Sequence, residues 1–209
     1  MAVDISTGYD WITPIVLSVN ETMLQGLLLG SSDFRSLRAN NEIYVDKTAL
    51  IYDMAEPSQR KKLFLVRPRR FGKSLLISTF ESLFKHGLRD FMGLAIEKLW
   101  NDKTYQVVRI DLSETKEFST ADEFKQKFYD KLIIKFSAAG FQYKNDGTLM
   151  MTQLFEWLSL LDFNCLVVLI DEYDTPLTSC LDQPNLFKEV RSTMSELFLT
   201  LKSNCAFSS

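Results

Sequence analysis

The run from Leu166 to Ile170, apolar at every position, constrains the fold of this 209-residue chain more than any other feature. Successive side chains of a strand point to opposite faces, so a strand that is apolar throughout must be covered on both faces. This requirement is typical of a central strand in a parallel sheet with helices on either side. Two acids, Asp171 and Glu172, follow the run directly.

Strand and helix patterns alternate along the rest of the chain. Short apolar stretches predict strands at 62–66 and 107–112. Apolar spacing, together with start signals such as the capping box of Thr120 and Glu123, predicts helices that begin near Ser74, Thr120, Thr148 and Pro184. The alternation predicts an α/β fold in which helices sandwich a layered, parallel sheet.

Composition excludes several other classes of protein. The longest apolar run, Cys165 to Ile170, is far shorter than the roughly 20 residues that cross a bilayer, so no membrane span is expected. Three widely spaced cysteines argue against a disulfide framework and a zinc site, and they favour a reducing, cytoplasmic location. The single histidine, His86, excludes a histidine-rich metal centre and is interpreted as a polar residue near a helix end.

The segment Arg67-Pro68-Arg69-Arg70-Phe71-Gly72-Lys73-Ser74 is a partial match to a phosphate-binding loop, with arginine at the first glycine position. Gly72 would let backbone N–H groups approach phosphate oxygens. Lys73 would reach the β- and γ-phosphates, and the Ser74 hydroxyl would bind Mg²⁺. The positive N-terminal end of the following helix would face the same anion, and Leu75 completes the cofactor-binding segment. The alternative is that the match arose by chance and that the segment is only an ordinary helix start.

The acids after the apolar run supply the second half of the hypothesis. Asp171, at the carboxyl end of a central strand, is placed to bind Mg²⁺ through water, and Glu172 could polarise the attacking water. The alternative is that both acids only solvate the end of a buried strand. Together with the loop, the pair favours a nucleotide site with Lys73, Asp171 and Glu172 as its catalytic groups.

Basic residues and one further acidic motif leave alternatives open. Arg67, Arg69 and Arg70 either contact phosphate or form a solvated basic turn, and Arg67 could instead hold the loop shape. Nucleic acid is a weaker partner than nucleotide because the net charge is −3, with basic residues bunched only at 60–62 and 67–70. The segment Asp111 to Lys116 superficially resembles a nuclease motif, but its spacing is wrong and it is interpreted as a solvated loop.

Three motifs together resemble the AAA-ATPase-like family of bacterial and related proteins. They are Tyr44-Val45-Asp46-Lys47-Thr48, Arg67 to Ser74, and Ile170-Asp171-Glu172-Tyr173-Asp174. The resemblance implies a P-loop ATPase of the additional-strand type with ATP and Mg²⁺ as cofactors, and it implies that arginine at position 67 is a family habit. Many members carry a nuclease-like domain beyond the ATPase region. For Asp46 to Thr48, a nucleotide contact and a structural role are both open.

The resemblance also shapes the expected domain organisation. Residues 1–30 are an unassigned N-terminal extension, and 31–209 form an AAA-ATPase-like domain that is apparently truncated at its C-terminus. We expect an ATP-binding module, an Mg²⁺-dependent ATPase whose hydrolysis is impaired in this shortened chain. The alternative is a nucleotide-gated interaction module that does not hydrolyse ATP and regulates a partner or a fused effector, such as a nuclease-like domain in cis.

Overall fold

A computed structural model describes residues 32–55, 63, 71–162 and 165–204. Its centre is a parallel pair of strands, β1 (Gln106–Asp111) and β2 (Leu166–Asp171). The pairing runs in register from Gln106 opposite Leu166 to Asp111 opposite Asp171. Both strands were predicted from the sequence, whereas the strand expected at 62–66 lies outside the described residues apart from Leu63.

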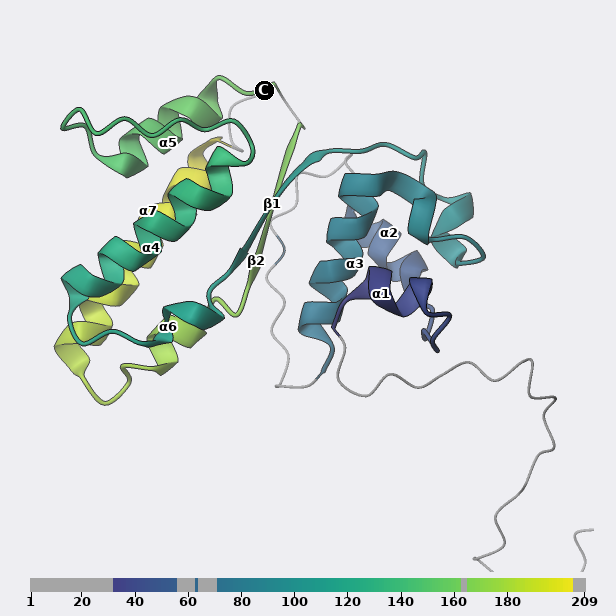
Figure 1. Cartoon of the computed structure of the whole chain (residues 1–209), viewed down its shortest axis with the longest axis horizontal. Coiled ribbons are helices and arrows are strands. Elements are labelled where there is room, and N and C mark those ends of the chain that lie inside the picture. The colour runs from purple at the N-terminus through teal and green to yellow at the C-terminus, as the bar shows by residue number, and fades with distance from the viewer. Residues whose placement is uncertain (1–31, 56–62, 64–70, 163–164, 205–209) are drawn as a thin grey trace, which may run out of the picture.

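Helices cover both faces of the strand pair, as Figure 1 shows. One side carries α1 (Phe34–Ala39), α2 (Thr48–Ala55), α3 (Lys73–His86) and the short helices η2 (Gly87–Asp90) and η3 (Ala95–Lys98). The other side carries η4 (Ser113–Lys116), α4 (Ala121–Ser137), α5 (Met150–Ser159), α6 (Thr175–Thr178) and α7 (Pro184–Asn204). The described part is therefore an α/β structure with a parallel sheet between helices, which is consistent with a P-loop-like fold.

Each face of the strand pair contributes to its own hydrophobic core. On β1, Val108 and Ile110 pack with α4, α5 and α7, while Val107 faces the core around α3. On β2, Val168 and Ile170 likewise belong to the core with α4, α5 and α7, and Leu169 belongs to the core around α3. The alternation is the period of two that a strand imposes on its side chains. It also places the odd-numbered Arg109 and Asp171 on the face toward α3.

Glycines mark both ends of α3. Gly72, the residue before the helix, has φ 73° and ψ 24°, the left-handed region that glycine enters without steric cost. Gly87, after the helix, has φ 63°, and a Cβ there would lie 2.1 Å from Asp102 Oδ1. The helix predicted to begin near Ser74 is thus confirmed, and its last residue is His86, which was expected near a helix end.

The predicted capping box at the start of α4 is present in a shifted form. Thr120 accepts a hydrogen bond from the Glu123 amide at 3.2 Å, as expected. The Glu123 carboxylate, however, accepts from the amide of Ser119 at 2.8 Å and not from that of Thr120. Both side chains still cap the start of the helix, but Glu123 bonds the residue before Thr120.

One expectation about burial is met in part and one needs correction. The apolar residues of β2, predicted to be covered on both faces, are partly buried, and among the described residues β2 pairs with β1 alone. The segment Asp111 to Lys116, predicted to be a solvated loop, contains the buried residues Leu112 and Thr115 and forms η4. Glu114 does reach solvent.

No helix within residues 32–55, 71–162 and 165–204 combines the length and the apolar character that a membrane crossing needs.

Candidate nucleotide site

The first turn of α3 has the backbone shape of an anion-binding helix start. Gly72 accepts the first helical hydrogen bond, from the Leu76 amide at 3.0 Å, and offers no side chain to cap the turn. The first turn carries no acidic residue. Amide groups at a helix start that meet neither a side-chain cap nor a carboxylate provide a positive end that favours an anion. Lys73 and Ser74 are half-buried in this turn.

Asp171 lies at the end of β2 and is 3% exposed. In Figure 1 the first turn of α3 and the carboxyl ends of both strands lie toward the same end of the strand pair. The register also sets Asp111, the last residue of β1, directly opposite Asp171. Two strand ends therefore bring carboxylates to the end of the sheet where α3 begins, which is where ligands bind in open α/β sheets.

Arg109 joins Asp171 to helix α3. Its guanidinium lies 3.5 Å from Asp171 Oδ2 and donates to Glu81 Oε2 at 3.0 Å. The other Asp171 oxygen, Oδ1, accepts from the Glu172 amide at 3.0 Å. A carboxylate as buried as Asp171 needs such partners, because burying a charge without compensation is costly. Arg109 thus orients the acid and couples β1, β2 and α3.

Glu172 has an unusual backbone. Its φ is 51°, in the left-handed region that costs a residue with a Cβ about 1–2 kcal/mol. Its carbonyl accepts from the Thr175 amide at 3.0 Å, and its carboxylate accepts from the Thr175 hydroxyl at 3.3 Å. The turn into α6 therefore holds this acid just beyond the strand end in a conformation that an unconstrained chain would avoid.

Asp174, the last residue of the Ile170 to Asp174 motif, carries an orphaned atom. Its Oδ1 is buried and has no hydrogen-bond partner among the residues that the structure describes. A buried acceptor left unpaired costs about 1–3 kcal/mol, and such an atom is explained by a water or an ion that completes it. Asp174 adds a third acid to Asp171, at the end of β2, and Glu172, just after it.

The predicted site residues divide into described and undescribed groups. Arg67, Pro68, Arg69 and Arg70 lie outside the described residues, so their contacts stay a prediction. Phe71 is 64% exposed beside Gly72, and Leu75 packs against the core under α3.

Two residues were not anticipated from the sequence. Arg109 could have been noticed as the one basic residue inside an apolar strand, although its partners Glu81 and Asp171 are remote in the chain. Asp174 stood in a quoted motif without an assigned role. Arg109 and Asp174 become candidate site residues only when the fold shows which groups surround them.

The residues Asp46 and Thr48 make structural contacts. Asp46 Oδ1 accepts from the Thr48 amide at 2.8 Å and from its hydroxyl at 2.7 Å, while Oδ2 accepts from the Ala95 amide at 2.8 Å. The Thr48 hydroxyl in turn accepts from the Ile96 amide at 3.1 Å. This motif ties the start of α2 to η3, in line with the structural alternative.

The donor set fits Mg²⁺ better than a metal caged by protein alone. Among the described residues, no three His, Cys, Asp or Glu side chains are grouped to hold an ion. Mg²⁺ usually takes one or two carboxylates and completes its shell with water and substrate phosphates. The buried Asp171 carboxylate, the Ser74 hydroxyl at the start of α3 and the orphaned Asp174 oxygen suit that kind of coordination.

A parallel sheet between helices, with a glycine-started helix and acids at the strand ends, is consistent with the P-loop class of α/β proteins. The chain belongs to the family described as Predicted AAA-ATPase, which it matches over residues 28–208. It is also 30% identical over 183 residues to an uncharacterized protein encoded in the vnfD 5′ region of Azotobacter chroococcum mcd 1. The match covers 86% of this chain but only 35% of that relative. No solved structure matches the chain significantly.

Proposed function

We propose that this chain is an ATP-binding module that hydrolyses ATP with Mg²⁺ at the start of α3. The observation that carries the proposal is the convergence of two remote segments at one end of the sheet. One is the uncapped, acid-free first turn of α3 after Gly72, and the other is the acid-rich end of β2. Membership of the predicted AAA-ATPase family supports nucleotide binding by the chain.

The side chains divide the work by their chemistry. Lys73 and the first-turn amides of α3 bind the phosphates, and the Ser74 hydroxyl and Asp171 hold Mg²⁺. Bound Mg²⁺ neutralises the negative charge that the phosphate oxygens develop during transfer. Glu172 orients the attacking water. Arg109 keeps the Asp171 carboxylate oriented, and arginines 67, 69 and 70 are proposed to add charge around the phosphates.

Steady-state turnover tests the catalytic half of this proposal. Glu172→Gln keeps the size of the side chain but removes its charge, so we expect ATP binding within about twofold of the parent and turnover lowered by about 10²-fold or more. Tight binding by the parent chain without turnover would instead support an interaction module gated by nucleotide. Equal turnover by Glu172→Gln and the parent would remove Glu172 from the mechanism.

A further inference from the structure

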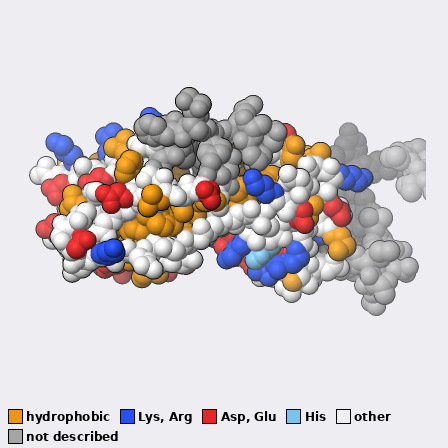
Figure 2. Space-filling model, turned by 90° about the horizontal axis from the view of Figure 1, so that it is seen from above, with side chains coloured by type: hydrophobic (Ala, Val, Ile, Leu, Met, Phe, Trp, Pro, Cys, Tyr) orange, Lys and Arg blue, Asp and Glu red, His pale blue; other side chains and the backbone are white. Residues whose placement is uncertain are grey.

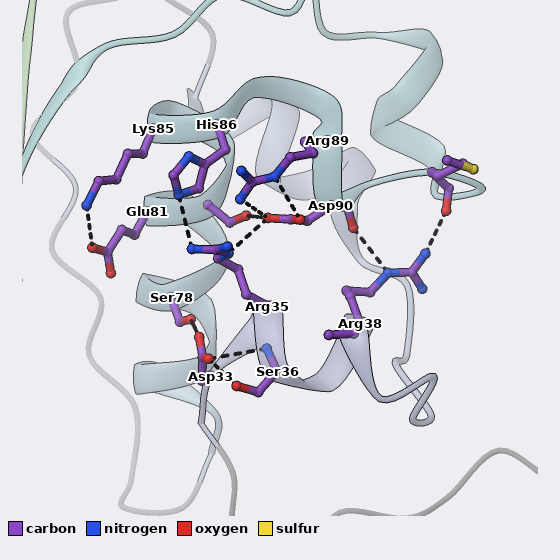
Figure 3. A pocket seen from close by; sticks show the side chains of 13 residues that line it. Asp33, Arg35, Ser36, Arg38, Ser78, Glu81, Lys85, His86, Arg89 and Asp90 are labelled. Carbon is purple, nitrogen blue, oxygen red and sulfur yellow. Dashed lines mark hydrogen bonds and ion pairs between the residues drawn. The ribbon is translucent and has the colours of Figure 1, made fainter.

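A polar pocket of about 720 Å³ lies away from the nucleotide site, between α1, the second half of α3 and η2. Figure 3 shows Arg35 of α1, His86 of α3 and Arg89 and Asp90 of η2 pointing toward one another there, while Lys85 points toward Glu81. The pocket is lined by the charged residues Asp33, Arg35, Arg38, Glu81, Lys85, Arg89 and Asp90 and by His86. The proposed ATPase site is linked to this cluster through Glu81, which accepts from Arg109, and it assigns no role to the other charged residues.

Three basic side chains of the pocket are more exposed to solvent than two of its carboxylates. The side chains of Arg35, Lys85 and Arg89 are 53%, 53% and 52% exposed, whereas those of Asp90 and Glu81 are 17% and 28% exposed. Figure 2 shows the same arrangement, with basic side chains gathered around the single histidine. A ligand that arrives from solvent therefore meets these three cations before Asp90 and Glu81, whereas Asp33, just before α1, is exposed as they are.

The carboxylates do not neutralise these cations fully. Asp90 is shared, since Arg35 lies 3.5 Å from it and Arg89 3.3 Å, and it also accepts from Ser82 at 2.6 Å. Glu81 lies 4.0 Å from Lys85 but only 3.0 Å from Arg109. Asp90 and Glu81 thus serve three rim cations, and Glu81 is engaged more closely with Arg109. The third carboxylate of the pocket, Asp33, accepts hydrogen bonds from the hydroxyls of Ser36 and Ser78.

The positive charge around His86 affects its pKa. Its Nε2 lies 3.4 Å from Arg35 Nη1. Burial lowers the pKa of His86, and the positive charges of Arg89, Arg35 and Lys85 lower it further, while Asp90 opposes them only in part. Lys85 and His86 also complement the negative end of α3, but Arg35 and Arg89 come from other elements and are not explained in that way.

We propose that this pocket, lined by Arg35, Lys85, His86 and Arg89, is a second anion site that binds the phosphate group of a nucleotide or polynucleotide. The two guanidinium groups are held near each other by Asp90, and such forks match phosphate oxygens. The pocket volume exceeds that of a single phosphate and leaves room for the moiety that carries it.

The single histidine makes the test direct, because the ring resonances of His86 in the untagged chain report on this pocket alone. The measurement is an NMR pH titration of the chain carrying Lys73→Ala, which disables the proposed ATP site. It is run in sodium chloride and then, at equal ionic strength, with inorganic phosphate, with AMP, or with a short single-stranded DNA. A bound anion favours protonated histidine, so we expect its pKa to rise by about 0.5–1 unit and to saturate.

Variants assign the effect to the pocket. In Arg35→Gln/Arg89→Gln we expect the free His86 pKa to rise and the response to phosphate to vanish, whereas Lys125→Gln on α4 should respond like the parent. If the glutamine pair unfolds, Arg35→Lys/Arg89→Lys keeps the charge and should retain a weakened response. A response to AMP or phosphate supports a small-ligand site, and a response to DNA alone supports a polynucleotide backbone. Responses no larger than those to chloride would overturn the proposal.

Discussion

At the scale of single residues, Arg109 is the side chain on which the orientation of the candidate metal-side acid depends. We expect Arg109→Gln to lower the free energy of unfolding by about 1–3 kcal/mol, because it leaves the Asp171 carboxylate buried with one partner fewer. Urea unfolding measures this loss. Added Mg²⁺ and ATP should restore part of it, since a metal ion can take the place of the guanidinium.

The exposed pair of Lys127 and Glu123 on α4 offers a matched control for Arg109. Lys127→Gln should change the unfolding free energy by no more than about 0.5 kcal/mol. A loss in Arg109→Gln as small as that of the control would show that the guanidinium does not support Asp171.

The sequence allowed Lys73, Ser74, Asp171 and Glu172 to be named, because each stands at a fixed offset from a strand or helix signal. Arg109 could not be assigned in this way. Its role depends on a parallel register that pairs it with Leu169 and on the face of β1 that meets α3. Contacts between segments so far apart in the chain follow from tertiary packing, which a local pattern does not encode.

At the scale of elements, the Asp46 and Thr48 pair connects α2 with η3. We expect Thr48→Val to lower the unfolding free energy by about 1–3 kcal/mol, because it leaves the buried Ile96 amide without its acceptor and removes one donor to Asp46. Denaturant titration checks this value. Nucleotide affinity should stay within about twofold of the parent once the variant is folded. A large loss of affinity with unchanged stability would instead assign this motif to the nucleotide.

Element types were predictable where apolar spacing and end signals agreed, as they do for α3 and α7. The short helices of the α1 to η3 region were not, because they contain only a few residues each and depend on contacts such as that of Asp46 with the Ala95 amide. The partial burial of β2 could not be predicted from a local sequence pattern either, since burial depends on which strands lie beside it.

At the scale of the whole molecule, several carboxylates make stability depend on pH. Burial acts to raise the pKa of Asp90, but hydrogen bonds from Ser82 and Arg89 outweigh it and the pKa lies below its ordinary value. The pKa of Asp46 is lowered in the same way by its bonds to Thr48 and Ala95, again against burial. A lowered folded-state pKa contributes stability that is present above the unfolded value and lost as pH falls through the folded one.

We therefore expect the free energy of unfolding to be constant near neutral pH and to fall once the pH drops below about 4. Urea unfolding at a series of pH values measures the trend. In Asp90→Asn the neutral-pH stability should be lower and the loss in acid smaller. An acid profile identical to that of the parent would show that Asp90 does not contribute.

The central claim is that the start of α3 binds nucleotide, and equilibrium titration of ATP into the chain with Mg²⁺ present tests it most directly. The parent and Lys125→Ala, changed at a lysine on α4 that lies over the Tyr129 ring, should bind alike. Lys73→Ala should bind at least about tenfold more weakly, which corresponds to roughly 1.4 kcal/mol. Equal affinities of all three proteins for ATP would contradict the assignment.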